Sequence, residues 1–84
     1  DSHSIIDDRT GRRVNPSKNV TINNHVWVGH RVSIGKGVSI ADNVVIGGSS
    51  FVSKSISESN TIVAGVPAKI IKRGINWINK RIPL

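Results

Sequence analysis

The sequence has no cysteine, no methionine, only three aromatic residues and no long apolar segment. Without cysteine, a disulfide framework and thiol chemistry are excluded. A complete translated chain begins with methionine, so we expect these 84 residues to be a piece of a longer protein. No stretch approaches the roughly 20 apolar residues that span a bilayer, and none resembles a signal peptide. We therefore expect a soluble, cytoplasmic protein without a transmembrane segment.

The chain is also poor in material for a conventional core. Hydrophobic residues make up 37% of it and aromatic residues 4%. A lone domain of this size buries only about 60–65% of the surface of its unfolded chain, which leaves it marginally stable. Eight glycines and many small residues favour a repetitive architecture instead.

Basic residues outnumber acidic residues in this chain. The formal net charge is +7, three of the five acidic residues lie within the first eight positions, and basic residues crowd the end of the chain. Such a field favours an anionic partner: nucleic acid, a membrane surface, a phosphorylated cofactor or an acidic polysaccharide. Charge alone does not choose among them.

A six-residue repeat runs through residues 22–57. One column is aliphatic throughout: Ile22, Val28, Ile34, Ile40, Ile46 and Val52. The next residue is always small or tolerant of turns: Asn23, Gly29, Gly35, Ala41, Gly47 and Ser53. A third column is aliphatic in five of six places: Val26, Val32, Val38, Val44, Ser50 and Ile56. A helix with a period of 3.6 residues does not keep step with this repeat, which predicts an all-β, parallel β-helix.

We expect residues 1–65 to form the β-helix domain, with regular coils at residues 22–57. Two coils are too few to stand alone, because stacked repeats need about three neighbours to bury a continuous core. Residues 1–21 should therefore add an irregular lower coil, in which residues 7–13 form a polar excursion. A missing N-terminal portion or a partner chain would cover what remains.

The pattern changes after the last repeat. Residues 57–60 are typical of a turn, Pro67 suits the first position of a helix, and Gly74 suits its end. The sequence therefore predicts a short helix from Pro67 to Arg73, within a C-terminal helix and tail at residues 66–84. Trp77 in this tail should pack over the end of the coil or against a neighbouring subunit.

Three groups of residues resemble a known family. The run from Asn24 to Gly29, the repeats after it, and the closing run from Asn60 to Lys69 look like the C-terminal half of hexapeptide-repeat acetyltransferases. The opening residues Asp1–Ser4, with residues 10–11 and 15–18, are most similar to capsular-polysaccharide and sialic-acid O-acetyltransferases. The resemblance covers residues 1–73. It implies a left-handed β-helix of triangular section, a homotrimer, and acetyl-coenzyme A bound between adjacent subunits.

The resemblance also assigns a catalytic pair, His3 and Trp27. These residues are 24 positions apart, which is one 18-residue coil plus six residues. Histidine suits a general base that takes the proton from an acceptor hydroxyl, because its pKa of about 6.5 lies near working pH. An indole or backbone N–H can stabilise the oxyanion that forms. The competing interpretations are a chain-end histidine without a role and a tryptophan that packs in a subunit interface.

By the same resemblance, six residues bind acetyl-coenzyme A: His30, Gly48, Ser53, Lys54, Lys69 and Lys72. The backbone N–H of His30 and the close approach allowed at Gly48 serve the pantetheine arm. The next two contact the adenosine end, and the last two lysines face the phosphates. Each also has an ordinary interpretation as a surface side chain or a turn glycine.

Three other functions fit the sequence less well. Three histidines could hold zinc, as in the gamma-class carbonic anhydrases of the same fold, but glycine occupies position 35, where that family has a second histidine. Nucleic-acid binding lacks a recognisable motif and has few aromatic residues for stacking. A non-catalytic β-helix scaffold has no need of His3 or Trp27. The sequence therefore favours an O-acetyltransferase that moves an acetyl group from acetyl-coenzyme A to a sugar hydroxyl, in a capsular or surface polysaccharide whose glycan is acidic.

Overall fold

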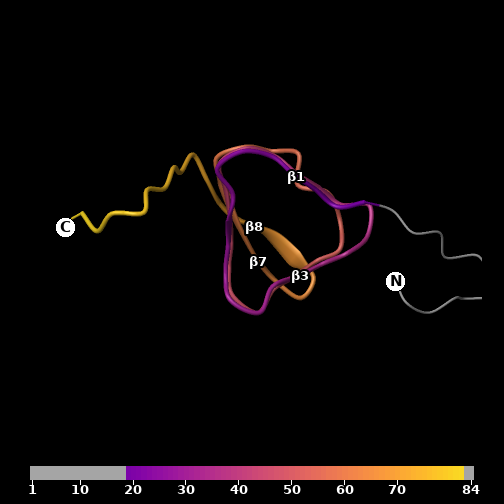
Figure 1. Ribbon diagram of the computed structural model, residues 1–84. Coiled ribbons are helices and arrows are strands. Elements are labelled where there is room, and N and C mark those ends of the chain that lie inside the picture. Colours follow the sequence, from indigo (N-terminus) through magenta and orange to yellow (C-terminus); the bar gives the residue numbers. More distant parts are fainter. Residues whose placement is uncertain (1–18, 83–84) are drawn as a thin grey trace, which may run out of the picture.

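The computed structural model describes residues 19–82, which form β-strands, turns and extended segments and no helix (Figure 1). The strands are short in the repeats and longer near the end: β1 (Thr21–Ile22), β2 (Trp27–Val28), β3 (Ser33–Ile34), β4 (Ser39–Ile40), β5 (Val44–Ile46), β6 (Phe51–Val52), β7 (Thr61–Gly65) and β8 (Ala68–Arg73). The expected all-β class is confirmed.

The first two described coils carry three strands each, and each strand of the first coil pairs with its counterpart in the second. Thr21 pairs with Ser39, Trp27 with Val45 and Ser33 with Phe51, all in parallel and all 18 residues apart. Three sheets result, with the strand orders β1-β4, β2-β5-β7-β8 and β3-β6. Viewed along its axis in Figure 1, the coil has a three-sided outline. The six-residue repeat therefore forms the expected stack of coils.

The interior of the coil is filled by aliphatic side chains from the repeat columns. The buried members among the described residues are Val38, Ile40, Val44, Ile46, Val52, Ile56 and Val63. Successive strand residues point to opposite sides, so one residue of each two-residue strand faces inward. Ser50 interrupts the aliphatic column and is also buried, but its Oγ accepts a hydrogen bond from the backbone N–H of Gly65 at 3.1 Å. Its polar group is therefore satisfied.

Left-handed residues mark the corners of the coil at a six-residue spacing. They are His25, Arg31, Gly37, Asn43 and Ser49, with φ between 57° and 73°. A positive φ turns the chain sharply, although it is costly for most residues with a Cβ. The repeat glycines stand elsewhere in the hexapeptide. A Cβ on Gly29 would lie 2.7 Å from Gly48 N and from Ile46 O, so this glycine allows adjacent coils to approach rather than a turn to form.

The predicted helix from Pro67 to Arg73 is wrong. Residues Ala68–Arg73 form β8, which pairs antiparallel with β7 after a tight turn at Val66 and Pro67. Gly65 enters this turn with a φ of +110°. Ala68 and Ile70 alternate inward and pack on the core, and β8 supplies partners for the outer edge of the last parallel strand. Burial of this period-two face outweighs the local helix signals.

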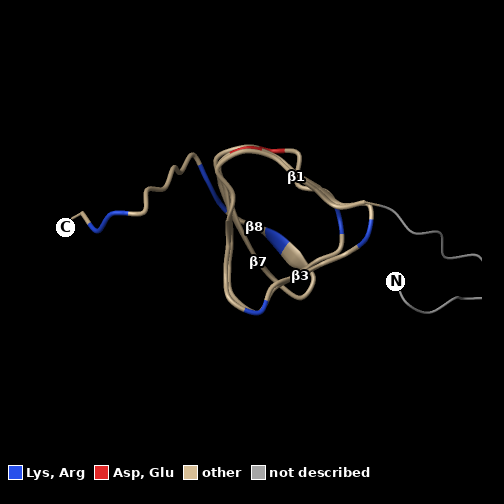
Figure 2. Cartoon of the chain, in the orientation of Figure 1, with Lys and Arg blue, Asp and Glu red and all other residues tan. Residues whose placement is uncertain are grey.

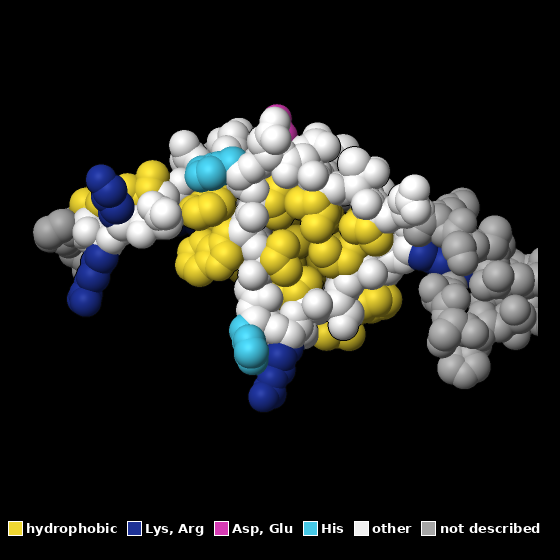
Figure 3. Space-filling model, in the orientation of Figure 1, with side chains coloured by type: hydrophobic (Ala, Val, Ile, Leu, Met, Phe, Trp, Pro, Cys, Tyr) yellow, Lys and Arg dark blue, Asp and Glu magenta, His cyan; other side chains and the backbone are white. Residues whose placement is uncertain are grey.

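The two ends of the described coil differ. At one end, the β7–β8 hairpin continues the sheet and packs Ala68 and Ile70 on the core. At the other end, apolar side chains of the first coil are open: Ile22 is 46% exposed and Val28 41%. Figure 3 shows an apolar area in the middle of the face that it presents. The predicted lower coil at residues 1–21 lies outside the described residues up to position 18.

Alanine at position 29 should destabilise the stack. Its Cβ would collide with backbone atoms of the next coil, which cannot rotate away as a side chain can. We expect Gly29→Ala to lower the free energy of unfolding by about 1–3 kcal/mol, measured by urea denaturation. Gly48→Ala is the matched control, because its Cβ would lie 3.3 Å from His30 O, a milder contact. Equal stability of the two variants would contradict the proposed spacing of the coils.

Candidate functional site

Trp27 stands on the outer surface of the sheet that contains β2, β5, β7 and β8. Its strand neighbour Val28 is in register with Ile46, which is buried, so Trp27 faces the other way. Across the strands of this sheet, Trp27 pairs with Val45, Val45 with Ile62, and Ile62 with Lys72. Trp27 is 53% exposed, and its indole nitrogen donates no hydrogen bond to any residue that the structure describes. The predicted catalytic tryptophan is therefore accessible and has an available donor.

The tail after β8 lies along one corner of the coil. The backbone N–H of Ile75 donates to the carbonyl of Asn60 at 3.0 Å. Farther on, the indole Nε1–H of Trp77 donates to the carbonyl of His25, also at 3.0 Å, across 52 positions of sequence. The rings of Trp77 and His25 stack with centroids 3.9 Å apart and an angle of 1° between their planes. Trp77 thus packs against a corner of the first coil rather than over its end.

Polar contacts hold this corner together between adjacent coils. His25 Nδ1 lies 2.7 Å from Asn43 Oδ1, and the two residues occupy equivalent left-handed positions. The backbone N–H of Asn24 donates to the carboxylate of Asp42 at 2.8 Å, and Asn43 N–H donates to the carbonyl of Asn24 at 3.1 Å. The surface on which Trp77 stacks is therefore fixed by hydrogen bonds as well as by backbone shape.

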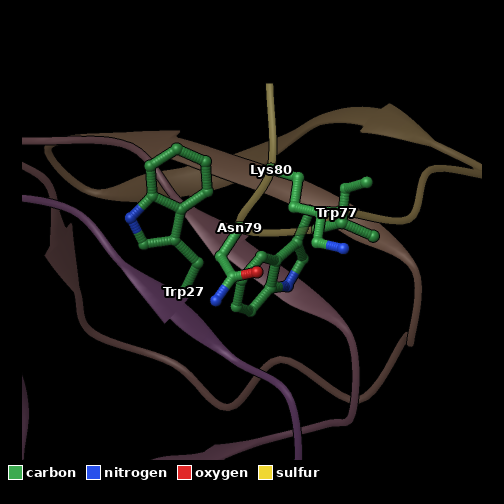
Figure 4. A pocket seen from close by; sticks show the side chains of 5 residues that line it. Trp27, Trp77, Asn79 and Lys80 are labelled. Atoms are coloured by element: carbon green, nitrogen blue, oxygen red, sulfur yellow. The ribbon is translucent and has the colours of Figure 1, made fainter. Parts of the chain in front are cut away.

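A hollow of about 350 Å³ lies between the tail and β2. It is lined by Trp27, Trp77, Ile78, Asn79 and Lys80. The two indoles are 5.8 Å apart between centroids and tilted by 47°, so they form two walls of an open wedge. In the view of Figure 4, the Asn79 amide overlaps the Trp77 ring, on the side toward Trp27. We call this hollow the tryptophan cleft.

The sequence did not predict the tryptophan cleft as a site. Four of its five lining residues come from the tail, which lies about fifty positions from Trp27 in sequence. The only local signal is a tryptophan among basic and polar residues, which indicates packing as readily as binding. Neither the Asn79 nor the Lys80 side chain contacts another described residue through a hydrogen bond or an ion pair.

The predicted cofactor residues are distributed over two parts of the coil. His30 and Gly48 are equivalent residues of successive coils at the corner before β3 and β6, where Ser49 N–H donates to the His30 carbonyl at 2.8 Å. Ser53 and Lys54 follow β6, at the opposite end of the same side. All four are exposed. The outward residues of this side, between the two ends, are Ser33 and Phe51.

Lys69 and Lys72 stand apart from these four residues on β8, where they pair with Ala64 and Ile62. Both lysines are exposed. The structure does not bring all six predicted residues into one cavity. An extended ligand along the β3–β6 side could contact the other four residues, from the His30–Gly48 corner to Lys54. Lys72 instead lies in the cross-strand row that contains Trp27.

The charge of the described surface is strongly one-sided. Residues 19–82 carry eight basic residues and two acidic ones, Asp42 and Glu58 (Figure 2). Glu58 pairs with Arg73 at 2.9 Å, and Asp42 accepts the Asn24 hydrogen bond. The remaining basic side chains therefore provide a positive field that favours anionic ligands.

The described residues form neither a metal-binding cluster nor a membrane-spanning helix. Between positions 19 and 82, no three His, Cys, Asp or Glu side chains gather as a metal site would require. None of the described segments is a helix with the length and apolar character needed to span a membrane. His25 and His30 stand at different corners of the first coil, before β2 and after it. His3, the predicted general base, lies outside the described residues, so its relation to Trp27 stays a prediction.

Comparison with known proteins gives a consistent result. Residues 19–54 match the family described as bacterial transferase hexapeptide (six repeats). No match was found among curated protein sequences. Among solved structures, the polysialic acid O-acetyltransferase OatWY is 46% identical with a TM-score of 0.92, over 98% of this chain and 39% of that one. The polySia-specific acetyltransferase NeuO is 46% identical with a TM-score of 0.86, over 95% of this chain and 37% of that one.

A third structure shows a bound ligand. A hexapeptide-repeat acetyltransferase from Vibrio cholerae, solved with acetyl-coenzyme A, is 34% identical with a TM-score of 0.64, over 67% of this chain and 30% of that one. The chain thus spans between 30% and 39% of the length of these three proteins. The matches confirm the resemblance inferred from the repeat and from the opening and closing motifs.

Proposed function

We propose that this chain, whose repeats belong to the bacterial transferase hexapeptide family, is part of an O-acetyltransferase that uses acetyl-coenzyme A. The acceptor is a sugar hydroxyl in a capsular or surface polysaccharide, of the sialic acid class. The observation that carries the proposal is the 46% identity with OatWY over 98% of the chain. The exposed Trp27, with its available indole N–H, agrees with it.

The proposed reaction needs two groups from this chain. His3 takes the proton from the acceptor hydroxyl as its oxygen attacks the thioester carbonyl carbon. Trp27 offers its N–H to the negative charge that develops on the carbonyl oxygen. The carbon–sulfur bond then breaks, His3 returns the proton to the departing thiolate, and the products are the acetyl ester and coenzyme A.

The residues on the β3–β6 side fit an extended thioester ligand. Gly48 has no side chain at the corner that it shares with His30, so a ligand can approach the backbone there. Lys54, at the far end of this side, is exposed and suits the anionic adenosine end of the ligand. Lys69 and Lys72 lie on β8, on another side of the coil. We propose that they reach the phosphates from an adjacent subunit, where lysine acts as a point charge without a fixed fork geometry.

Several parts of the proposal concern the assembled protein. We propose a left-handed sense for the coil and a homotrimer in which the ligand lies between subunits, as the family resemblance implies. Exposed apolar residues on the coil, such as Phe51 and Ile71, agree with association. We also propose that the chain has two parts, a β-helix domain at residues 1–65 and a C-terminal part at residues 66–84. The reaction belongs in the cytoplasm, where acetyl-coenzyme A is available.

Coenzyme A binding should depend on the lysines near the proposed ligand path. We expect Lys54→Ala with Lys72→Ala to weaken binding about 3- to 10-fold at low salt, because each exposed charge contributes up to about 1 kcal/mol. Titration calorimetry measures the change. Lys80→Ala with Arg81→Ala removes the same charge from the tail and should leave the affinity unchanged. Equal losses in both double variants would indicate a general charge effect and contradict the assigned path.

Turnover should depend on His3 without a matching change in coenzyme A affinity. General base catalysis contributes about 10²- to 10⁴-fold, so His3→Ala should lower kcat by that factor. His3→Gln keeps hydrogen-bonding capacity but cannot take a proton at neutral pH, and it should lose as much. Release of free thiol measures the rate. A variant that retains full activity would remove His3 from the mechanism.

A further inference from the structure

The tail forms most of the tryptophan cleft and is held in place at two points. The Ile75–Asn60 hydrogen bond fixes its start. The Trp77 stack on His25, with its hydrogen bond to the His25 carbonyl, fixes its middle. The indole N–H of Trp77 donates to the His25 carbonyl, and one face of its ring stacks on the His25 imidazole. Trp77 therefore offers the cleft the rest of its ring surface and no side-chain donor. The wall that faces Trp27 is therefore apolar and defined by the coil.

The chemistry of the cleft suits a sugar ring. A pyranose has faces made of C–H groups, which pack against aromatic rings, and an edge of hydroxyl groups that need hydrogen-bond partners. Trp27 and Trp77 provide two ring surfaces, and the Asn79 amide can both donate and accept. The volume of about 350 Å³ is at the small end of the roughly 300–1,000 Å³ found for small-molecule sites. One sugar unit is the ligand that this size favours.

The charge of the cleft selects among sugars. Lys80 lines it, Arg81 follows, and no acidic residue takes part. The two acidic residues of the described chain are engaged elsewhere, Glu58 with Arg73 and Asp42 with Asn24. The Lys80 ammonium therefore has no carboxylate partner among the described residues. A neutral sugar would form no ion pair with the Lys80 ammonium, whereas a sugar carboxylate would pair with it.

We propose that the tryptophan cleft is a subsite for one carboxylate-bearing sugar unit of the acceptor polysaccharide. One apolar face of the sugar packs on the ring surface that the contacting Trp27 and Trp77 indoles leave open to the cleft. Asn79 binds its hydroxyl or amide groups, and Lys80 pairs with its carboxylate. This inference rests on the proposed function. It adds a specificity-determining role for the tail, which places an acidic sugar beside the tryptophan that we assign to the reaction.

The test compares Lys80→Ala with Arg81→Ala. Both variants remove one positive charge from neighbouring positions of the tail, but only Lys80 lines the cleft. With oligosialic acid as acceptor, we expect Lys80→Ala to raise KM about 2- to 5-fold with kcat unchanged, as for an exposed ion pair. Arg81→Ala should change KM less. With carboxyl-reduced oligosialic acid, wild type and Lys80→Ala should have the same KM.

Trp77 provides a second and larger effect. Trp77→Ala should raise KM for oligosialic acid about tenfold, and Trp77→Phe should recover part of this loss because it keeps an aromatic face. Thermal unfolding of each variant separates loss of the subsite from loss of the fold. Coenzyme A affinity, measured by calorimetry, should be the same in wild type and in all four variants.

Three outcomes would overturn the subsite. Equal KM changes in Lys80→Ala and Arg81→Ala would show a general charge effect. A loss of coenzyme A affinity in Trp77→Phe would assign the cleft to the cofactor. A change in molecular mass in solution, with acceptor KM unchanged, would assign it to a contact between copies of the chain.

Direct titration of wild type with oligosialic acid, followed by tryptophan fluorescence, keeps the subsite separate from the proposed reaction. Saturable binding that is weakened by Lys80→Ala supports the subsite even if wild type fails to bind coenzyme A, a failure that would refute the proposed function alone. Absence of oligosialic acid binding by a chain that binds coenzyme A would refute the subsite alone.

Discussion

The parallel register of 18 residues between successive coils is the constraint on which the rest of the structure depends. It requires adjacent backbones to approach closely, and Gly29 meets this requirement by having no Cβ where Gly48 N and Ile46 O lie. Once the register is set, residues 18 apart form columns, with aliphatic residues inside and exposed residues outside. Trp27 and the His30–Gly48 corner take their positions from these columns and not from any local motif.

The last part of the chain departs from this register: β5 pairs with β7 at a separation of 17 residues, and β8 is antiparallel to β7. The hairpin of β7 and β8 supplies partners for the edge of the last parallel strand and packs Ala68 and Ile70 on the core. The tail then follows the corner from Asn60 toward His25 and brings Trp77 against Trp27. The outer surface of the coil thereby acquires a concave place, the tryptophan cleft. We locate acceptor recognition in that place and cofactor binding along the β3–β6 side.

The sequence was sufficient for the coil and insufficient for the tail. A period of six over residues 22–57 has few structural solutions, so the strands and the columns could be predicted. Pro67 and Gly74 are local signals for a helix, but the free edge of β7 and the apolar side chains at Ala68 and Ile70 favoured a strand. The tryptophan cleft depends on a contact between Trp77 and His25, 52 positions apart, which no repeat or motif indicates.

The central claim is that the two substrates approach Trp27 from different places: the pantetheine and adenosine parts of acetyl-coenzyme A lie along the β3–β6 side, and an acidic sugar lies in the tryptophan cleft. A crystal structure with coenzyme A and an oligosialic acid bound together tests it most directly. The account predicts the pantetheine arm at the His30–Gly48 corner, the adenosine end toward Lys54, and a sugar carboxylate at Lys80. The adenosine end of coenzyme A lying in the tryptophan cleft, or the sugar bound away from it, would contradict the account.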